Sequence, residues 1–325
     1  MKRARLVEES RRAIAEGSKS FSAASRLFDK TTRERVWMLY AWCRRCDDLA
    51  DAQDKGGDLG DQSDIAHAVK HLRVMTKAAL EGRQTADPAF AAFAQVAAEC
   101  RLTMSHANDV ITGFQLDADD WRPRTEADLM RYCWHVAGAV GVMMALVMGV
   151  KRDDDFTLDR ACDLGLAFQL ANIARDIVED DAAGRCYLPE MWLVEEDIEP
   201  GQHTKPHHRQ ELADMAAKLV DLMEHHADAS RIGAARLPFR SRWAILSAAR
   251  IYTAIGREVR KKGTAAWDHR VYTSKLQKIW HVLAAFFEAV RNRPPHLERM
   301  PKWSRSDFAE FRIVEHDGPI DYAVE

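Results

Sequence analysis

The chain has 325 residues, 47% of them hydrophobic, which is enough for one large domain or two small ones with a sizeable core. Its 47 basic and 50 acidic residues leave a net charge of −3, which excludes a whole-chain positive field for nucleic acid. The N-terminus does not read as a signal peptide, so we expect a cytoplasmic protein whose six cysteines are reduced thiols.

Helix-forming residues are abundant and alternating β-branched runs are scarce, so the sequence predicts an all-α fold. The expected helices cover residues 5–16, 32–53, 62–81, 88–99, 103–116, 125–149, 157–181, 189–196, 207–230, 236–262 and 272–293. Repeats and long linkers are not evident, so we expect one domain over residues 1–300. The tail, 301–325, lacks helical periodicity from Trp303 onward and is expected to be loosely ordered.

The first helix of the chain is basic and is the segment we expect to contact a membrane surface. Its apolar residues are Leu6, Val7 and Ile14, and its cations lie between Lys2 and Arg12. A helix of this kind binds weakly and peripherally, through its apolar face and its cations.

The helix expected over residues 32–53 carries a chemically unusual stripe. Tyr40, Arg44, Asp47 and Asp51 are spaced by four, three and four residues, which places them on one helix face. Two carboxylates one turn apart repel each other unless a cation lies between them. Magnesium suits that geometry, because it binds one or two carboxylates together with water and substrate phosphates. A solvated acidic face remains the alternative for this stripe taken alone.

The most membrane-like run, Val136 to Val150, contains fifteen residues without a charge. A spanning helix needs about 20 such residues, so a buried central helix is the better interpretation. Gly138, Gly141 and Gly149 then allow a neighbouring helix or a ligand to approach closely. This helix suits the wall of a tunnel for a long apolar chain, although plain core packing explains the pattern equally well.

The helix expected over residues 157–181 carries a second polar stripe among apolar residues. The stripe consists of Gly165, Gln169, Asn172, Asp176 and, one turn later, Glu179 and Asp180. Such a polar row inside a buried helix is costly unless a ligand satisfies it. Arg175 can bind a phosphate oxygen while its neighbour Asp176 binds a metal. Two such helices facing each other predict a pair of metal clamps for a diphosphate, in which divalent ions neutralise the leaving group as it ionises.

These stretches resemble the squalene/phytoene synthase family. The matching stretches run in family order and are residues 17–21, 40–51, 132–138, 161–180 and 183–189. The resemblance implies a single-domain isoprenoid-synthase fold with a central cavity. It also implies a prenyltransferase of carotenoid biosynthesis. In this reaction two geranylgeranyl diphosphates condense head to head, through prephytoene diphosphate, to phytoene, and release two diphosphates.

The resemblance also implies roles for individual residues. Magnesium, or manganese in its place, is expected at Asp47, Asp48, Asp51, Asn172, Asp176, Glu179 and Asp180. Diphosphate is expected at Ser18, Arg44, Arg175 and Arg185. The cavity is expected to be lined by Phe21, Tyr40, Tyr132, Val136, Ala137, Gln169, Tyr187 and Tyr252. Of these, Tyr132 is expected to act with Asp47, Asp51, Asp176 and Asp180 in catalysis, by handling a proton or shielding a cation.

Three other interpretations remain open from the sequence. A chain-elongating prenyl synthase fits the first motif, but has a further aspartate-rich motif where this chain has Asn172, Arg175 and Asp176. A squalene or dehydrosqualene synthase that uses farnesyl diphosphate fits both motifs. A non-catalytic helical scaffold with the same fold predicts damaged carboxylate motifs, whereas both are intact. No NADPH is expected, and the sequence does not set the oligomeric state.

Overall fold

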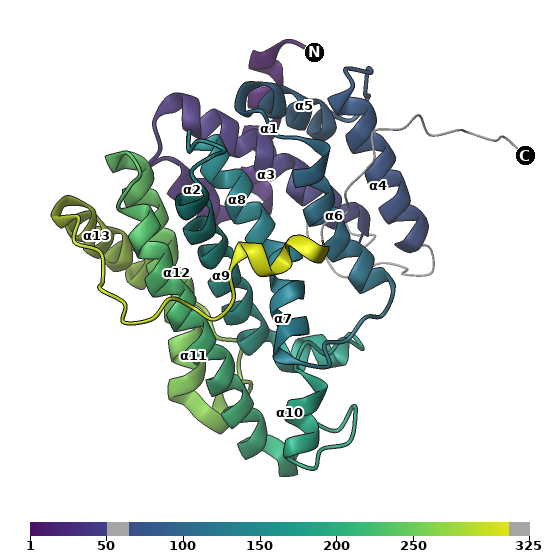
Figure 1. The fold of residues 1–325 in the computed structure, drawn as a ribbon, viewed down its shortest axis with the longest axis vertical. Coiled ribbons are helices and arrows are strands. Elements are labelled where there is room, and N and C mark those ends of the chain that lie inside the picture. Colours follow the sequence, from purple (N-terminus) through teal and green to yellow (C-terminus); the bar gives the residue numbers. More distant parts are fainter. Residues whose placement is uncertain (51–64, 312–325) are drawn as a thin grey trace, which may run out of the picture.

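The computed structural model describes residues 1–50 and 65–311, and every regular element in this part is helical, which confirms the all-α prediction (Figure 1). The first elements are α1 (Arg3–Gly17), α2 (Lys19–Ser25), α3 (Lys30–Ala50), α4 (Ile65–Leu80), α5 (Pro88–Cys100) and α6 (Met104–Ala118). The next are α7 (Glu126–Cys133), a π-helix (Trp134–Gly138), α8 (Ala139–Val147), α9 (Asp155–Ala182) and α10 (Glu190–Glu195). The last are α11 (Arg209–Ala234), α12 (Phe239–Lys262) and α13 (Lys275–Arg291), with short 3₁₀ turns at Pro206–His208, Gly263–Ala265 and Arg305–Phe311.

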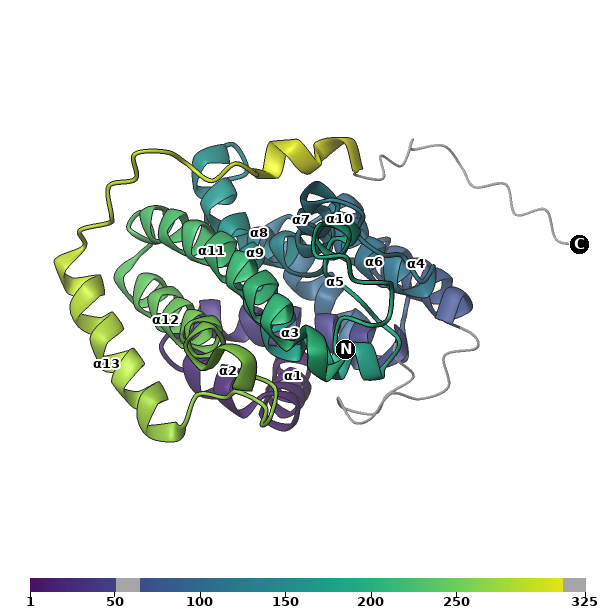
Figure 2. The same ribbon diagram turned by 90° about the horizontal axis from the view of Figure 1, so that it is seen from below.

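The centre of the fold is α9, which α8, α11 and α12 surround (Figure 2). Apolar side chains cover most of the circumference of this 28-residue helix, so it lacks the broad polar face that a surface helix turns to solvent. Leu166, Leu170 and Ile173 are buried in this packing. From Gly165 to Asp176 the polar stripe of α9 is therefore held inside the protein, as the sequence predicts, whereas Glu179 at its end is exposed.

Two glycines set the close approach of α8 to α9. A Cβ atom added at Gly141 would lie 2.3 Å from the carbonyl oxygen of Ala161, and one at Gly165 would lie 2.3 Å from that of Ala137. Real Cβ atoms never come so close to backbone atoms, so the two helix backbones touch only because side chains are absent at these positions. The expected close approach at Gly141 is thus confirmed. Gly149 has a different use, because it follows α8 with a positive φ of 94°.

The apolar run after residue 125 forms three helical pieces instead of one continuous α-helix. Between α7 and α8 the backbone widens to a π-helix over Trp134–Gly138. Such insertions occur frequently at functional sites, because they turn side chains away from the α-helical register. Within the described residues one stretch, Glu126–Val147, is long and apolar enough to cross a membrane, but 67% of its apolar 18-residue window is buried inside the protein. This burial agrees with the predicted central helix.

Capping residues explain where several helices begin. The Asp87 carboxylate accepts a hydrogen bond of 2.9 Å from the amide of Ala89, with Pro88 in the first helical position of α5. The Ser18 hydroxyl accepts a hydrogen bond of 3.2 Å from the amide of Phe21 and so starts α2. The sequence analysis did not predict α2, because seven residues are too few for a helical period to stand out.

Two segments pack against the core more closely than the sequence indicates. In α1, Leu6 and Ile14 are buried in the core and Val7 packs against it, so the large apolar side chains of this helix face the protein. The tail is also ordered as far as residue 311: Phe308 is buried and stacks on Trp134 with ring centroids 5.7 Å apart. Arg305 holds this segment to α9 through a 2.8 Å ion pair with Asp159.

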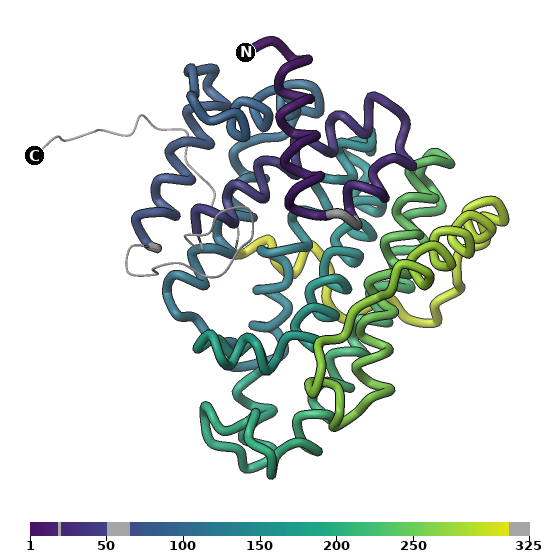
Figure 3. The backbone as a smooth tube through the Cα atoms, turned by 180° about the vertical axis from the view of Figure 1, so that it is seen from behind, coloured from purple at the N-terminus to yellow at the C-terminus, as the bar shows by residue number. Residues whose placement is uncertain are grey.

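A hairpin of α12 and α13 forms one flank of the molecule (Figure 3). The inner side of α12 packs on α9 and α11, while α13 packs along the outer side of α12. The Trp243 indole of α12 donates a 2.9 Å hydrogen bond to the carbonyl of Val282 in α13. The hairpin therefore consists of an inner helix that faces the centre and an outer helix at the periphery.

Candidate functional site

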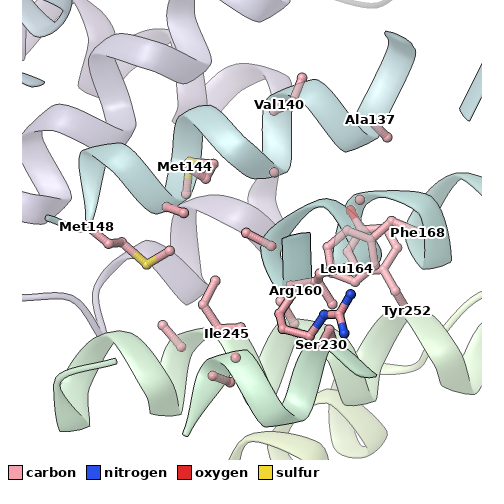
Figure 4. Close-up of a pocket in the computed structure, with 18 of the residues that line it drawn as sticks. Ala137, Val140, Met144, Met148, Arg160, Leu164, Phe168, Ser230, Ile245 and Tyr252 are labelled. Atoms are coloured by element: carbon pink, nitrogen blue, oxygen red, sulfur yellow. The ribbon is translucent and has the colours of Figure 1, made fainter. Parts of the chain in front are cut away.

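An apolar cavity of about 360 Å³ lies between α8, α9 and α12 (Figure 4). At one end, the rings of Phe168 and Tyr252 stack with centroids 4.2 Å apart, close to Ala137. At the other end lie Met148 and Ile245. The cavity is therefore elongated and lined mostly by carbon, which suits a chain-like hydrocarbon ligand.

Eight residues that the sequence analysis assigned to substrate or metal line this cavity together. They are Ser18, Phe21, Tyr40, Val136, Ala137, Gln169, Asn172 and Tyr252. The π-helix contributes Val136 and Ala137, so the widened backbone forms part of the wall. Sequence reasoning missed the lining residues Phe168, Met144 and Met148, whose large apolar side chains look like ordinary core in the sequence.

A second, polar pocket of about 390 Å³ adjoins the apolar cavity. Its charged and hydroxyl-bearing lining residues come from four segments and are Tyr40, Arg44, Asp47, Asp117, Tyr132 and Arg185. The two pockets share Tyr40, Val136, Val140 and Gln169. Because they share these walls, they form one site with a polar mouth and an apolar interior, a division that matches an amphiphilic ligand with a charged head.

The first carboxylate motif places its two described aspartates in different environments. Arg44 binds both, with 2.9 Å from its guanidinium nitrogens to a carboxylate oxygen of Asp47 and to one of Asp48. The Asp47 side chain is 40% exposed and lines the polar pocket, whereas that of Asp48 is 9% exposed and lines a groove beside α1. Asp47 is thus the carboxylate of this pair that a ligand in the polar pocket can reach. Asp51 lies outside the described residues.

In the second motif, Asp176 lies between two arginines. Arg175 binds it in a bidentate manner, with one hydrogen bond of 2.7 Å from Nε, and Arg270 adds an ion pair of 3.0 Å from the loop after α12. Guanidinium groups in this arrangement can also bind phosphate oxygens. Asp176 and its arginines therefore form a second charged cluster, on the same helix as Gln169 and Asn172 of the cavity wall.

The fold raises the pKa of the Asp180 carboxyl group. Burial raises its pKa from an ordinary 3.8 to about 7, and the negative charges of Asp176, Glu179 and Asp117 add to this rise while Arg185 opposes it. A carboxylate that is hard to ionise among other carboxylates is a place where a divalent cation is electrostatically favoured. The electrostatics of this end of α9 therefore favour a bound cation.

Asp117 of α6 is a functional residue that the sequence analysis missed. Its carboxylate accepts a hydrogen bond of 3.2 Å from the hydroxyl of Tyr132 and one of 2.9 Å from that of Tyr187. The two tyrosine rings stack with centroids 4.5 Å apart. Val110, Phe114 and Asp117 follow the same spacing of four and three residues as the recognised motifs, and all three line the polar pocket. That stripe was the signal that could have identified Asp117.

Both tyrosines stay protonated in this environment. Burial raises the pKa of the Tyr132 phenol well above its usual range, and the adjacent Asp117 raises it further. The same two causes, in the same order, raise the pKa of Tyr187. Both tyrosines were predicted to line the cavity. Tyr132 lines the polar pocket, whereas Tyr187, which stacks on it, lines neither of the two pockets. Neutral phenols can donate hydrogen bonds and present ring faces, but they do not act as bases.

The carboxylates of the site suit magnesium that is bound together with a substrate. Among residues 1–50 and 65–311, no three His, Cys, Asp or Glu side chains converge closely enough to hold a metal by themselves. Magnesium, however, is usually held by one or two carboxylates together with substrate phosphates. Asp47 on α3, and Asp176 and Asp180 on α9, fit this second mode, in which ions are bound together with a diphosphate.

Comparison with known proteins identifies the family. The family model for squalene/phytoene synthases matches residues 14–277. Among solved structures, a dehydrosqualene synthase in complex with a ligand superimposes with a TM-score of 0.78, at 26% identity, and covers 90% of this chain and 98% of its own. A squalene synthase from Alicyclobacillus acidocaldarius has a TM-score of 0.68 at 25% identity, and the match covers 79% of this chain and 94% of its own.

Curated relatives are more similar in sequence. A phytoene synthase from Pseudescherichia vulneris is 44% identical over 304 residues, which is 92% of this chain and 98% of the relative. A 15-cis-phytoene synthase from Pantoea ananas is also 44% identical, over 91% of this chain and 98% of its own. The motif order, the helical fold and these matches agree, and the chain belongs to the squalene/phytoene synthase family.

Proposed function

We propose that this protein condenses two molecules of geranylgeranyl diphosphate head to head and so forms phytoene. The observation that carries the proposal is the 44% identity to bacterial phytoene synthases over 92% of the chain. The solved dehydrosqualene synthase is less similar, at 26% identity. The site geometry supports the same chemistry, because a charged mouth opens into an apolar cavity. Prephytoene diphosphate is the intermediate of the proposed reaction.

The polar mouth binds the diphosphate groups in this proposal. Arg44 and Arg185 line the polar pocket, and Ser18 lines the adjoining cavity, so the arginines can donate to phosphate oxygens there. Arg175 and Arg270 offer a second set of donors at Asp176. Fixing the two diphosphates at different sides of the mouth aligns the two prenyl chains for bond formation.

Magnesium completes this site in the proposal, held by Asp47 on one side and by Asp176, Asp180 and Asn172 on the other. When bound, the ions neutralise the diphosphate as it leaves. The raised pKa of Asp180 supports this assignment, since a nearby cation favours the ionised carboxylate. Asp48 supports this site by its ion pair with Arg44, and Glu179 adds negative charge next to Asp180.

The apolar cavity protects the carbocation that forms when the diphosphate leaves. Its walls of carbon exclude water, which would otherwise quench the cation. The stacked rings of Phe168 and Tyr252 in the cavity present π-electrons to a positive charge, and Tyr132 lines the adjoining polar pocket. Tyr132 is held in place by its hydrogen bond to Asp117. It acts as a neutral phenol, because its pKa is raised.

A kinetic comparison tests the substrate assignment. The purified protein is incubated with magnesium and either geranylgeranyl or farnesyl diphosphate, with and without NADPH, and kcat/KM is measured for each substrate. We expect a higher kcat/KM for the 20-carbon substrate and no effect of NADPH. A higher value for farnesyl diphosphate would assign the protein to dehydrosqualene or squalene formation, and a strict NADPH requirement would identify the latter.

A further inference from the structure

The outer side of α13 exposes a continuous row of large apolar side chains. Half of the large apolar side chains that the described part exposes lie between residues 272 and 290. Leu276 is 80% exposed, Trp280 66% and Phe287 61%. Together with Ile279, Leu283 and Val290 they form the outward face of α13. Their spacing of three and four residues makes this one contiguous stripe, whereas isolated exposed apolar residues need no explanation.

The inner side of the same helix is firmly attached, so the outward face is not a core that failed to close. Ala285 and Ala289 are fully buried against the hairpin partner α12. Glu288 points inward, where it pairs with Arg231 of α11 and, at 2.8 Å, with Arg250 of α12. Rotating α13 so that its outward face turned toward the protein would break both ion pairs and leave Arg231 and Arg250 without Glu288. The ion pairs therefore fix the orientation of α13.

The charges around the outward face have one sign. Between residues 270 and 293 the only carboxylate is Glu288, and it is the inward one. Lys275 lies before the apolar stripe and Arg291 and Arg293 lie after it, whereas Arg270 and Lys278 already have partners within the protein. A surface that complements this face must therefore be apolar in the middle and anionic around it.

Aromatic residues complete the pattern. Tyr272 is 77% exposed just before the helix, and Trp280 and Phe287 lie along its outward face. Aromatic and basic residues of this kind occur where a helix lies in the boundary between lipid headgroups and acyl chains. We propose that the outward face of α13 docks the enzyme onto a membrane surface that contains anionic lipid.

A second copy of this chain fits the same face less well. A symmetric pair buries the same patch of both subunits, so the cations at the ends of α13 would meet each other, or else meet an apolar stripe. The segment provides no outward carboxylate to compensate them. Anionic headgroups supply the missing charge, while their acyl chains accommodate Leu276, Trp280 and Phe287.

The position of α13 next to the cavity indicates what membrane docking would do. This part of the proposal rests on the proposed function. The outer side of α12 carries α13, and Ala244, Ala248 and Tyr252 on its inner side line the apolar cavity. The membrane-facing helix is therefore separated from the substrate cavity by a single helix. A lipid-soluble substrate and product then have a short path between cavity and bilayer.

Vesicle binding of the full-length protein tests the proposal. Co-sedimentation is measured with vesicles of phosphatidylcholine alone and with added phosphatidylglycerol, at low and high salt. The test variant is Trp280→Glu/Phe287→Glu, and the matched control is Met191→Glu/Val194→Glu, which changes two exposed apolar residues on α10. We expect binding that needs the anionic lipid and weakens with salt, and a partition coefficient at least about tenfold lower for the test variant only.

Equal binding by the Trp280→Glu/Phe287→Glu variant and the control would overturn the proposal. So would sedimentation velocity showing a dimer that the test variant alone dissociates, which would assign the face to a second copy. Binding that arises only after removal of residues 312–325 would assign it to the chain's own C-terminal segment. Because binding is measured without substrate, its failure is distinct from a failure to form phytoene, and turnover in detergent is expected to be unchanged in both variants.

Discussion

Tyr187 donates a 2.9 Å hydrogen bond to Asp117, and this contact joins the segment after α9 to α6. The same carboxylate accepts a hydrogen bond from the hydroxyl of Tyr132, so one half-buried acid holds two stacked tyrosine rings. Through Tyr132 the arrangement reaches the polar pocket that adjoins the apolar cavity. Asp117 therefore sets the position of a residue that lines the polar pocket.

Asp117→Asn is expected to lower kcat by roughly tenfold to a hundredfold, because hydrogen bonds to a charged group contribute about 1.5–3 kcal/mol. KM for geranylgeranyl diphosphate should change little, since the Tyr132 ring is needed mainly once the cation forms. Tyr187→Phe removes one of the two bonds and is expected to have a smaller effect. Steady-state kinetics of both variants check this, and a wild-type kcat in Asp117→Asn would refute the positioning role.

Neighbouring aspartates of the first motif should behave differently on substitution. Asp47→Asn is expected to reduce turnover on the order of a hundredfold or more, with the melting temperature unchanged, because the exposed carboxylate serves the ligand. Asp48→Asn is expected to cost about 1–3 kcal/mol of stability, because it removes a buried charge partner of Arg44. Thermal unfolding and turnover are measured on both variants, and the reverse pattern would contradict the assignment.

The raised pKa of Asp180 predicts a pH dependence of stability in protein stripped of metal with EDTA. The folded protein retains this proton up to about pH 7, whereas the unfolded chain releases it near 3.8. The folded state thus binds more protons between these values, so the free energy of unfolding falls as pH rises from about 4 to about 7. Asp180→Asn is expected to flatten this slope and to be more stable than wild type at neutral pH.

Denaturant unfolding across this pH range measures the effect. Added magnesium with diphosphate should restore stability to the wild-type protein at neutral pH, because ligands that bind only the folded state stabilise it. The same slope in wild type and in Asp180→Asn would show that Asp180 titrates as an ordinary exposed carboxyl group.

Ala248 offers a test of cavity length. It lies on α12 between Tyr252, at one end of the cavity, and Ile245, at the other. Ala248→Phe is expected to shorten the apolar space and to raise the preference for farnesyl over geranylgeranyl diphosphate by roughly tenfold or more in relative kcat/KM. Ala248→Ser, which adds little volume, is the control. An unchanged ratio in Ala248→Phe would place the ends of the prenyl chains elsewhere.

The sequence predicted those parts of the protein whose pattern is local. The polar stripe of α9 stands out because Gln169, Asn172 and Asp176 interrupt an apolar helix at a regular spacing, and the structure keeps this stripe inside. The charge-free run after His135 was likewise identified as a buried helix, and Val142, Met143 and Val147 of this run lie in the core. Each of these conclusions depended on residues within a few helical turns.

Features that depend on packing between distant segments could not be predicted in the same way. Asp117 gains its role only because α6 brings it beside Tyr132 and Tyr187. The widening of the backbone at Trp134–Gly138 has no composition that marks it. The burial of Phe308 depends on a contact with Trp134, far away in the chain. Asp48 lines the groove beside α1 instead of the polar pocket, and this depends on how α1 packs against α3.

The most direct test of the account is the identity of the product. Purified protein is incubated with magnesium and geranylgeranyl diphosphate, without a nicotinamide, and the lipid extract is identified by mass and by ultraviolet absorption, with Asp47→Asn as the control. The account predicts the 40-carbon hydrocarbon phytoene from the wild-type protein, a trace from the variant, and none in EDTA. An elongated prenyl diphosphate, or no hydrocarbon product, would contradict it.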